Sequence, residues 1–387
     1  MNLELLKQKF LELHKGTKED INVYFAPGRV NLIGEHVDYN GGCVFPCALS
    51  FGTYVLARKV KKDSISFSSE NFDFKINILL KAIQEKIGDQ WVNYPLGVIN
   101  QFVEKGFEIS GLQLLFSGDL PKGAGLSSSA SIEMATAVML NDLFQCDINK
   151  VGLVKMAQNA ENKFVGVNCG IMDQFASGLG KKDSAIFLDC NTLDYEIVPI
   201  NLDGYKLIIS NTNKPRNLID SKYNERRSEC EKAVEYISVN HPIKFLGDLS
   251  LKEFNELKSE IKDDVITKRA YHVISEINRT ELAVKVLKEG NIIRFGQLMN
   301  ESHDSLRNYY EVTGFELDTL VNESRKVEGM IGSRMTGAGF GGCTVSVVKT
   351  AFVQKFIKQV GENYTLKTKL IPEFYIADIS DGARKIE

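Results

Sequence analysis

An arginine and several acids share one short, glycine-flanked segment of this chain. Arg29 stands in APGRVNLIGEHVDYNGG, and Glu35, His36 and Asp38 follow it within ten residues. An arginine fork can hold a phosphate or a carboxylate through two parallel hydrogen bonds. Clustered acids provide the several fixed acceptors that sugar hydroxyl groups need. A lone histidine is more often structural than catalytic, so we assign His36 no proton-transfer role.

A second acidic segment, ENKFVGVNCGIMDQ, carries Glu161 and Asp173. At ~100° per residue Glu161 lies about 80° from Leu153, on the flank of an apolar helix face; alone it would be interpreted as a solvated position. Gly166 and Gly170 end that helix, and Asp173 falls in the first turn of the next one, where the helix dipole favours an ionised carboxylate. In phosphoryl transfer one group holds the nucleophilic hydroxyl while Mg²⁺ covers the phosphates. The two carboxylates therefore favour a metal–nucleotide site.

A glycine- and serine-rich loop, PKGAGLSSSAS at 121–131, lies between a predicted strand and a predicted helix. Small residues let backbone N–H groups approach an anion, and the helix N-terminus adds its positive dipole end. The loop is not a Walker A motif, because no GK[ST] follows Gly123 or Gly125. Ser127 or Ser128 could instead simply cap the helix. Spacing alone leaves phosphate binding and a capped loop both open.

The segment TGAGFGGC, at 336–343, matches G-x-G-x-x-G formally. A dinucleotide fingerprint must open a helix, but the sequel CTVSVV predicts a strand, so the dehydrogenase interpretation fails. What remains is a tight turn that requires positive φ, or a backbone wall against the phosphates or the sugar.

These motifs need a scaffold of mixed helices and strands. The pattern predicts an α+β protein in two lobes with a boundary near 195–215. Helices are expected at 1–16, near 149–164, around Ile132 to Leu143 and through much of 213–330; strands are expected at 21–25, 52–60, 111–117, 184–189, 194–199, 205–210, 343–348 and near 372–377.

Composition excludes several classes of protein. The 387 residues are 43% hydrophobic and 25% charged, and 47 basic against 50 acidic residues give a net charge of −3. This weighs against disorder and against nucleic-acid or membrane-surface binding. The sequence lacks a run of about 18 apolar residues, so no membrane span is expected, and the N-terminus predicts an amphipathic helix, not a signal peptide. Seven scattered cysteines without a CxxC pair favour the cytoplasm. The five histidines lack zinc-ligand spacing.

Three of these segments together resemble a known enzyme family. APGRVNLIGEHVDYNGG resembles the galactokinase signature, GAGLSSSAS the phosphate loop of the sugar, homoserine and mevalonate (GHMP) kinase superfamily, and MTGAGFGG its third motif. The resemblance implies a lobe like ribosomal protein S5 at 1–200 and a ferredoxin-like lobe at 201–387. It implies ATP and Mg²⁺ between the lobes, with galactose beside the γ-phosphate. The implied products are galactose 1-phosphate and ADP.

The resemblance also implies a role for individual residues. Asp173 would face the sugar 1-hydroxyl, and Arg29 would stabilise the transferring phosphoryl group. The implied sugar contacts are Glu35, His36, Val37, Asp38, Gly170 and Tyr223; the implied ATP contacts are Ser69, Gly123, Ala124, Gly125, Leu126, Ser127, Ser128 and Ser129; the implied Mg²⁺ ligands are Ser129 and Glu161.

Some questions stay open at this point. Beside Arg29 and a helix N-terminus, Asp173 should have a depressed pKa and be a weak base, so positioning could matter more than proton removal. Two rival functions are a kinase for N-acetylgalactosamine or another hexose, and a non-catalytic galactose-sensing regulator. The intact 127–131 serine loop weighs against the regulator. We expect galactose and ATP as partners, no nucleic acid or membrane, and a monomer.

Overall fold

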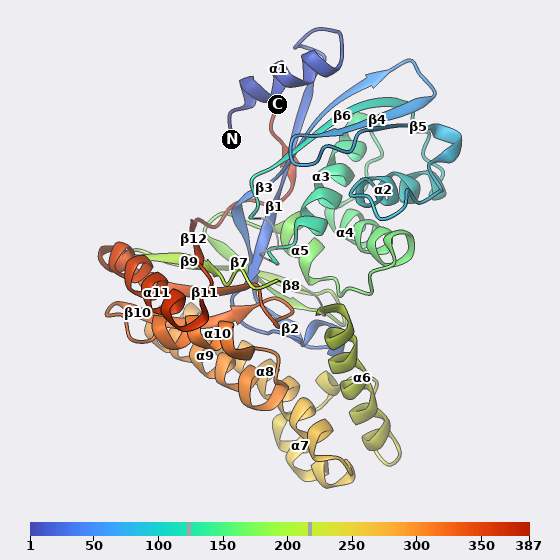
Figure 1. Ribbon diagram of the computed structural model, residues 1–387. Coiled ribbons are helices and arrows are strands. Elements are labelled where there is room, and N and C mark those ends of the chain that lie inside the picture. The colour runs from blue at the N-terminus through green and yellow to red at the C-terminus, as the bar shows by residue number, and fades with distance from the viewer. Residues whose placement is uncertain (122–124, 216–218) are drawn as a thin grey trace.

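The computed structural model describes residues 1–121, 125–215 and 219–387. Within these residues the strands form three sheets, with helices packed against them (Figure 1). The largest sheet has six strands in the order β13-β1-β3-β6-β4-β5. Its strands are β1 (Asn22–Asn31), β3 (Pro46–Val60), β4 (Ser64–Ser69), β5 (Ile76–Leu79), β6 (Gly111–Gly118) and β13 (Arg384–Lys385).

Both faces of this sheet are covered, because successive side chains of a strand point to opposite faces. Val55 and Ala57 of β3 belong to the large core under the helices, whereas Leu56 lies in a smaller cluster with Leu6 and Phe10 of the first helix. That helix is α1 (Leu3–Leu13), and the helices of the other face are α2 (Asn93–Glu104), α3 (Ser128–Leu143), α4 (Lys150–Asn159) and α5 (Met172–Leu179).

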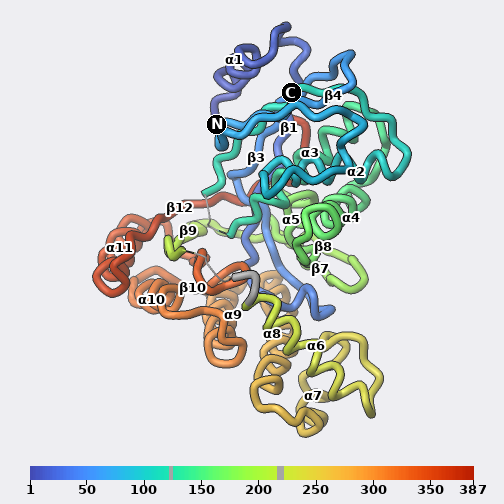
Figure 2. The backbone as a smooth tube through the Cα atoms, turned by 45° about the vertical axis from the view of Figure 1, so that its right-hand side comes forward, coloured from blue at the N-terminus to red at the C-terminus, as the bar shows by residue number. Residues whose placement is uncertain are grey.

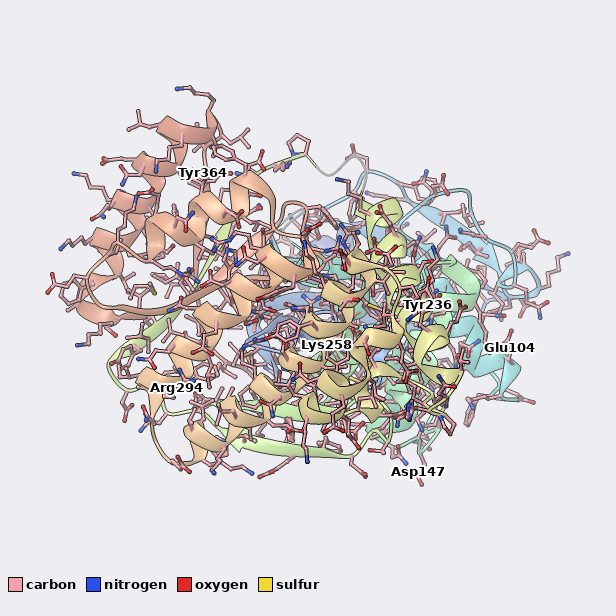
Figure 3. All side chains as sticks on the ribbon, turned by 90° about the horizontal axis from the view of Figure 1, so that it is seen from below. Glu104, Asp147, Tyr236, Lys258, Arg294 and Tyr364 are labelled. Carbon is pink, nitrogen blue, oxygen red and sulfur yellow. The ribbon has the colours of Figure 1, made fainter. Side chains whose placement is uncertain are left out.

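The second half of the chain builds a four-stranded sheet in the order β10-β11-β9-β12, and β2, β7 and β8 form a small third sheet. Seen from below, the long helices of this half lie across the front of the molecule (Figure 3). The strands are β2 (Cys43–Val44), β7 (Ser184–Asp189), β8 (Tyr195–Pro199), β9 (Tyr205–Asn211), β10 (Met330–Thr336), β11 (Cys343–Lys349) and β12 (Glu373–Ala377); the helices are α6 (Ile219–Ser238), α7 (Leu251–Leu257), α8 (Asp264–Lys288), α9 (Ile292–Ser305), α10 (Gly314–Ser324) and α11 (Val353–Thr368).

One irregularity in β1 positions the first motif. The pairing of β1 with β3 shifts register between Pro27 and Arg29, and a β-bulge of this kind re-aims a side chain. Helices α3 and α5 are hydrogen-bonded to β1 beside this bulge. The Ser131 hydroxyl of α3 donates to the Ala26 carbonyl at 2.8 Å, and the Ser177 hydroxyl of α5 donates to the Pro27 carbonyl at 2.7 Å. The bulge thus fixes Arg29 close to both helices.

The predicted strands at 111–117, 184–189, 194–199 and 205–210 are present with nearly the expected bounds. The strand expected at 21–25 continues to Asn31, because the bulge lets the pairing with β3 resume beyond Pro27. The chain end returns to the first sheet, where β13 pairs with β1, so the tube view shows both termini on the same lobe (Figure 2). The division at residue 200 stays a prediction. Among the described residues no helix is long and apolar enough to cross a membrane.

Candidate active site

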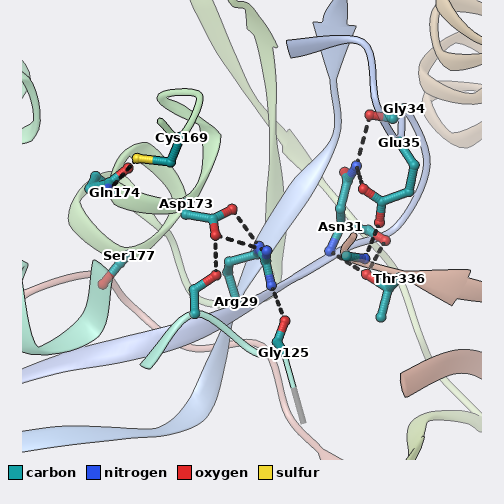
Figure 4. A network of polar contacts seen from close by, with 12 residues as sticks. Arg29, Asn31, Gly34, Glu35, Gly125, Cys169, Asp173, Gln174, Ser177 and Thr336 are labelled. Carbon is teal, nitrogen blue, oxygen red and sulfur yellow. Dashed lines mark hydrogen bonds and ion pairs between the residues drawn. The ribbon is translucent and has the colours of Figure 1, made fainter. Parts of the chain in front are cut away.

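The centre of the site is an ion pair between two motifs that are far apart in sequence. The Arg29 guanidinium donates from Nε to Oδ1 of Asp173 at 2.8 Å and from Nη2 to Oδ2 at 2.9 Å (Figure 4). Its Nη1 donates to the Gly125 carbonyl at 2.8 Å. Arg29 is buried, and Asp173 occupies the first turn of α5 as predicted. A bidentate pair of this kind is both strong and directional, so it fixes the orientation of the Asp173 carboxylate.

The serine loop approaches the same carboxylate. Ser127 stands at the N-cap of α3 with a left-handed backbone (φ 60°), and its side chain makes no capping bond to the helix. The Ser127 hydroxyl donates instead to Oδ2 of Asp173. Of the two alternatives that spacing left open, helix capping is therefore not what Ser127 does. Gly123 and Ala124, expected at the phosphates, lie outside the described residues.

A cavity of about 370 Å³ opens beside the ion pair. It brings together most of the predicted catalytic and sugar-binding residues, two residues of the third glycine motif (Gly337 and Ala338), and others that the sequence did not point to. The predicted lining residues are Arg29, Glu35, His36, Asp38, Glu161, Gly170, Asp173 and Tyr223; further lining residues are Tyr39, Gly166, Val167, Asn168, Cys169, Met172, Asn224, Gly337 and Ala338.

The Glu35 carboxylate ties the first motif to the third. Its Oε1 accepts the backbone N–H of Gly337 at 2.7 Å, and its Oε2 accepts Nδ2 of Asn31 at 3.1 Å. A guanidinium nitrogen of the fully buried Arg334 lies 3.5 Å from Oε1. Gly337 has a φ of 88°, so the third motif begins with a positive-φ turn, and this turn lines the cavity.

The Asp38 carboxylate lies near two other carboxylates, those of Asp173 and Glu35, and directly against Gly170. Burial and the neighbouring Asp173 and Glu35 raise the pKa of Asp38 to about 7. A Cβ added to Gly170 would lie 1.8 Å from Oδ2 of Asp38. Tyr223 is near as well: burial raises the pKa of its hydroxyl, and the Asp38 charge adds to that shift. Gly170 is therefore needed to let the Asp38 carboxylate occupy this position.

Glu161 is buried, unlike the solvated flank that its helix position alone suggests. The helix widens into a π-helix over Ala160–Val165, and Oε2 of Glu161 accepts Nε2 of Gln174 at 2.6 Å. Gln174 also donates to Glu133 at 3.1 Å. Burial and Asp173 raise the pKa of Glu161, and a hydrogen bond with Ser129 opposes that shift.

A second cavity, of about 340 Å³, lies beside the serine loop. Three of the predicted ATP contacts, Ser69, Ser128 and Ser129, line it. Its aromatic wall includes Phe72 and Trp91, whose rings stack with centroids 6.1 Å apart and 16° between their planes. Because Ser129 also contacts Glu161, which lines the first cavity, the serine loop stands between the two cavities.

Family models and curated proteins match this chain along most of its length. Residues 8–59 match the family model for the galactokinase galactose-binding signature, 93–181 the GHMP kinases N-terminal domain, and 283–365 the GHMP kinases C-terminal domain. A curated galactokinase of Fusobacterium nucleatum is 53% identical over the full length of both chains. One of Clostridium beijerinckii is 54% identical and covers 100% of this chain and 99% of its own length. The chain belongs to the galactokinase family.

Solved structures agree with the family assignment. A Lactococcus lactis galactokinase complexed with galactose superimposes with a TM-score of 0.96 at 45% identity, covering 99% of this chain and 100% of its own. A Methanococcus jannaschii mevalonate kinase has a TM-score of 0.66 at 18% identity and covers 93% of this chain and 98% of its own, which shows a shared fold. The predicted two-lobed GHMP kinase fold and the predicted enzyme class are confirmed.

Two predicted contact residues are buried in core clusters away from both cavities, and three residues near the site were not predicted. The Val37 side chain is fully buried in the main core, and Leu126 is buried in a second core cluster, so neither side chain lines either cavity. Sequence reasoning missed Gln174 and Glu133, although Gln174 directly follows Asp173. It also missed Trp91, and the signal that could have drawn attention to this residue is that the chain has a single tryptophan.

Gly170→Ala should lower kcat/KM for galactose at least about tenfold, because an added methyl must displace the Asp38 carboxylate. The KM for ATP should change little. Gly361→Ala is the matched control, since it lies in α11, outside both cavities, where a Cβ would meet only the Phe374 ring, at 3.3 Å. Steady-state kinetics on both substrates check the prediction; equal losses of galactose and ATP affinity in Gly170→Ala would contradict a local effect.

The raised pKa of Asp38 predicts a pH-dependent stability. With a folded-state pKa of about 7 against an ordinary value of 3.8, the sugar-free protein binds more protons than the unfolded chain between these pH values. The free energy of unfolding therefore falls as pH rises through this window, by on the order of 4 kcal/mol at most. Asp38→Asn should raise the melting temperature at pH 8 and change it little at pH 4. The same shift at both pH values would refute this assignment.

Proposed function

We propose that this chain transfers the γ-phosphoryl group of ATP to the 1-hydroxyl of galactose, with galactose in the cavity beside Asp38 and the nucleotide in the cavity lined by Ser69 and Trp91. The observation that carries the proposal is the Arg29–Asp173 pair, which lines the first cavity and is bonded directly to the serine loop. A hydroxyl held by Asp173 would face a phosphate held by that loop.

Asp173 is well suited to orient the sugar hydroxyl. Each carboxylate oxygen offers about two lone-pair positions, and Oδ2 already accepts from both Arg29 and Ser127. Oδ1 accepts from Arg29 alone among the described residues, so Oδ1 has room for the 1-hydroxyl proton. A loose transition state demands little covalent help. We infer that positioning by Oδ1, with the Arg29 charge beside the transferring group, is the main contribution of this pair.

The second cavity suits a nucleotide. An apolar wall with a few polar groups is typical of a ligand pocket, and the Phe72 and Trp91 rings offer a flat surface for a base. Ser128 begins the 16-residue helix α3, whose N-terminus attracts phosphate. Arg29 holds the Gly125 carbonyl and so fixes the part of the loop that leads into the helix.

Ser129 and Glu161 fit a magnesium ion. Mg²⁺ prefers oxygen ligands and takes only one or two carboxylates, leaving its other positions to water and phosphate. A buried carboxylate next to a serine hydroxyl and Asp173 provides this donor set. Within the described ranges no cluster of three or more His, Cys, Asp or Glu side chains could hold a metal by itself. When bound, the ion would neutralise charge on the phosphates.

A coupled assay for ADP release, run with galactose, N-acetylgalactosamine and glucose in separate reactions, tests the proposed function. We expect ATP-dependent turnover with galactose and much weaker turnover with the other two sugars. Preferred use of N-acetylgalactosamine would identify the rival hexose kinase. Galactose binding without ADP release would identify a sugar-sensing regulator.

Glu161→Ala should raise the Mg²⁺ concentration for half-maximal activity more than it raises the KM for galactose. Removing one of few protein ligands weakens the metal site. Glu289→Ala, at an exposed position, is the control and should leave the Mg²⁺ titration unchanged. If Glu161→Ala also leaves the titration unchanged, Glu161 is a structural residue of the π-helix.

We also propose the cytoplasm as the location, supported by the scattered cysteines of the sequence. Fractionation of cells that express the protein tests this location. A monomeric state and the absence of nucleic-acid and membrane partners stay predictions.

A further inference from the structure

A series of hydrogen bonds runs from the wall of the sugar cavity into the protein interior. Nδ1 of His36 lies 2.8 Å from the Tyr39 hydroxyl, which lies 2.9 Å from the Tyr310 hydroxyl. The Tyr310 hydroxyl in turn lies 3.2 Å from Sγ of Cys230. This hydrogen-bond series joins the first motif to α6 and to the π-helix at Leu306–Tyr310.

The surroundings of His36 leave its ring little freedom. Its backbone has a φ of 63°, and Nδ2 of Asn40 donates to its carbonyl at 2.8 Å. Its ring centroid lies 4.8 Å from that of Tyr310 and 5.8 Å from that of Tyr223. Tyr310 and Cys230 are almost completely buried. Since the ring cannot rotate freely, the position of its proton, on Nδ1 or on Nε2, decides what His36 offers to the cavity.

His36 is neutral and carries one ring proton. Burial and the nearby His272 lower its pKa to about 3. Its Nε2 is buried and has no hydrogen-bond partner within the described residues. Two proton arrangements satisfy the series: Tyr39 donates to Nδ1, which leaves the proton on Nε2, or Nδ1 donates to Tyr39.

The cavity favours the first arrangement. Glu35 and Asp173 line it as well, and an ionised carboxylate only accepts hydrogen bonds. A bare Nε2 would add a further acceptor to that wall, whereas a protonated Nε2 supplies a donor.

We propose that Tyr39 and Tyr310 are positioning residues that hold His36 in its Nε2–H form, so that this neutral imidazole donates to one hydroxyl oxygen of the bound sugar. The proposal rests on the proposed galactose site, because it assigns the direction of one hydrogen bond within it. Tyr310 acts through Tyr39, and Cys230 ends the series, where sulfur is only a weak partner.

The first test is ¹⁵N NMR of the sugar-free protein, in which five histidines give few ring signals. His36, assigned by comparison with His36→Gln, should show protonated Nε2 and bare Nδ1. Tyr39→Phe removes the donor to Nδ1 and should produce a mixture of tautomers, and Tyr310→Phe should give a smaller change in the same direction. Tyr309→Phe, next to Tyr310 but outside the hydrogen-bond series, should change nothing. Protonated Nδ1 in the wild type would overturn the proposal.

The second test pairs Tyr39→Phe with galactose analogues deoxygenated at one position each. The variant should lower kcat/KM for galactose about tenfold, leave the KM for ATP unchanged, and cause no additional loss with the one analogue that lacks the His36-bound oxygen. Equal losses on every analogue would mean a structural role and reject the proposal. If wild-type protein does not phosphorylate galactose, the proposed function fails, whereas the NMR test still gives its own answer.

Discussion

Asp173→Asn is expected to lower kcat for galactose phosphorylation by about 10²–10⁴, with little change in the KM for galactose. The amide would replace one carboxylate oxygen by an NH₂ group, which cannot accept from Arg29 or Ser127. Because Arg29 donates to both oxygens, its fork loses one of two bonds in either orientation of the amide. If the NH₂ group takes the place of Oδ1, the acceptor for the sugar hydroxyl is lost as well; if it takes the place of Oδ2, the Ser127 bond is lost. A group that acts mainly in the transition state lowers kcat without a matching rise in KM.

Two further variants calibrate this loss. Asp203→Asn, at an exposed position, is the control and should keep the wild-type kcat. Ser127→Ala removes one donor from Oδ2 but leaves the Arg29–Asp173 pair and Oδ1 in place, so we expect a smaller loss than in Asp173→Asn. Thermal unfolding must first show that all three variants fold. If Asp173→Asn keeps kcat within about tenfold of wild type, Asp173 has no part in the mechanism.

Local features of the site could be predicted from the sequence because they depend on neighbouring residues. A glycine break followed by an acid predicts Asp173 in a first helical turn, and the structure places it there. The expected strand after the third glycine motif is β11, which begins at Cys343. The positive φ of Gly337 likewise follows from a tight turn that only glycine adopts easily.

Features that depend on distant contacts could not be predicted in this way. The ordinary helical period places Glu161 on a flank, but the π-helix at Ala160–Val165 changes that period and the residue is buried. Its partner Gln174 and the neighbouring Glu133 come from other helices. The stacking of Phe72 on Trp91 belongs to no motif and joins two segments through tertiary packing. Sequence periodicity carries no information on such pairings.

Asp38→Ala is expected to reduce the preference for galactose over its 4-epimer, glucose, by about 10–10². The resemblance to galactokinases implies that Asp38 and Tyr223 contact the axial 4-hydroxyl. The two side chains are close to each other, since the Asp38 charge adds to the effect of burial in raising the pKa of the Tyr223 hydroxyl. A polar group left unpaired by a displaced hydroxyl costs roughly 1–3 kcal/mol, and more if it is charged. Glucose leaves both groups unpaired, so wild-type protein should reject it.

The ratio of the two kcat/KM values separates recognition from loop structure. If Asp38 distinguishes galactose from glucose, Asp38→Ala lowers kcat/KM strongly for galactose and little for glucose. The reason is that the 4-hydroxyl of glucose makes no hydrogen bond with Asp38 even in the wild-type protein. Asp38 also supports the first motif through its close contact with Gly170, and loss of that support would harm both sugars alike. Equal losses would therefore mean that Asp38 holds the 26–42 segment in shape. Asp38→Asn, which keeps the volume and removes the charge, should lower the galactose value less than alanine does, since one acceptor oxygen remains for the 4-hydroxyl.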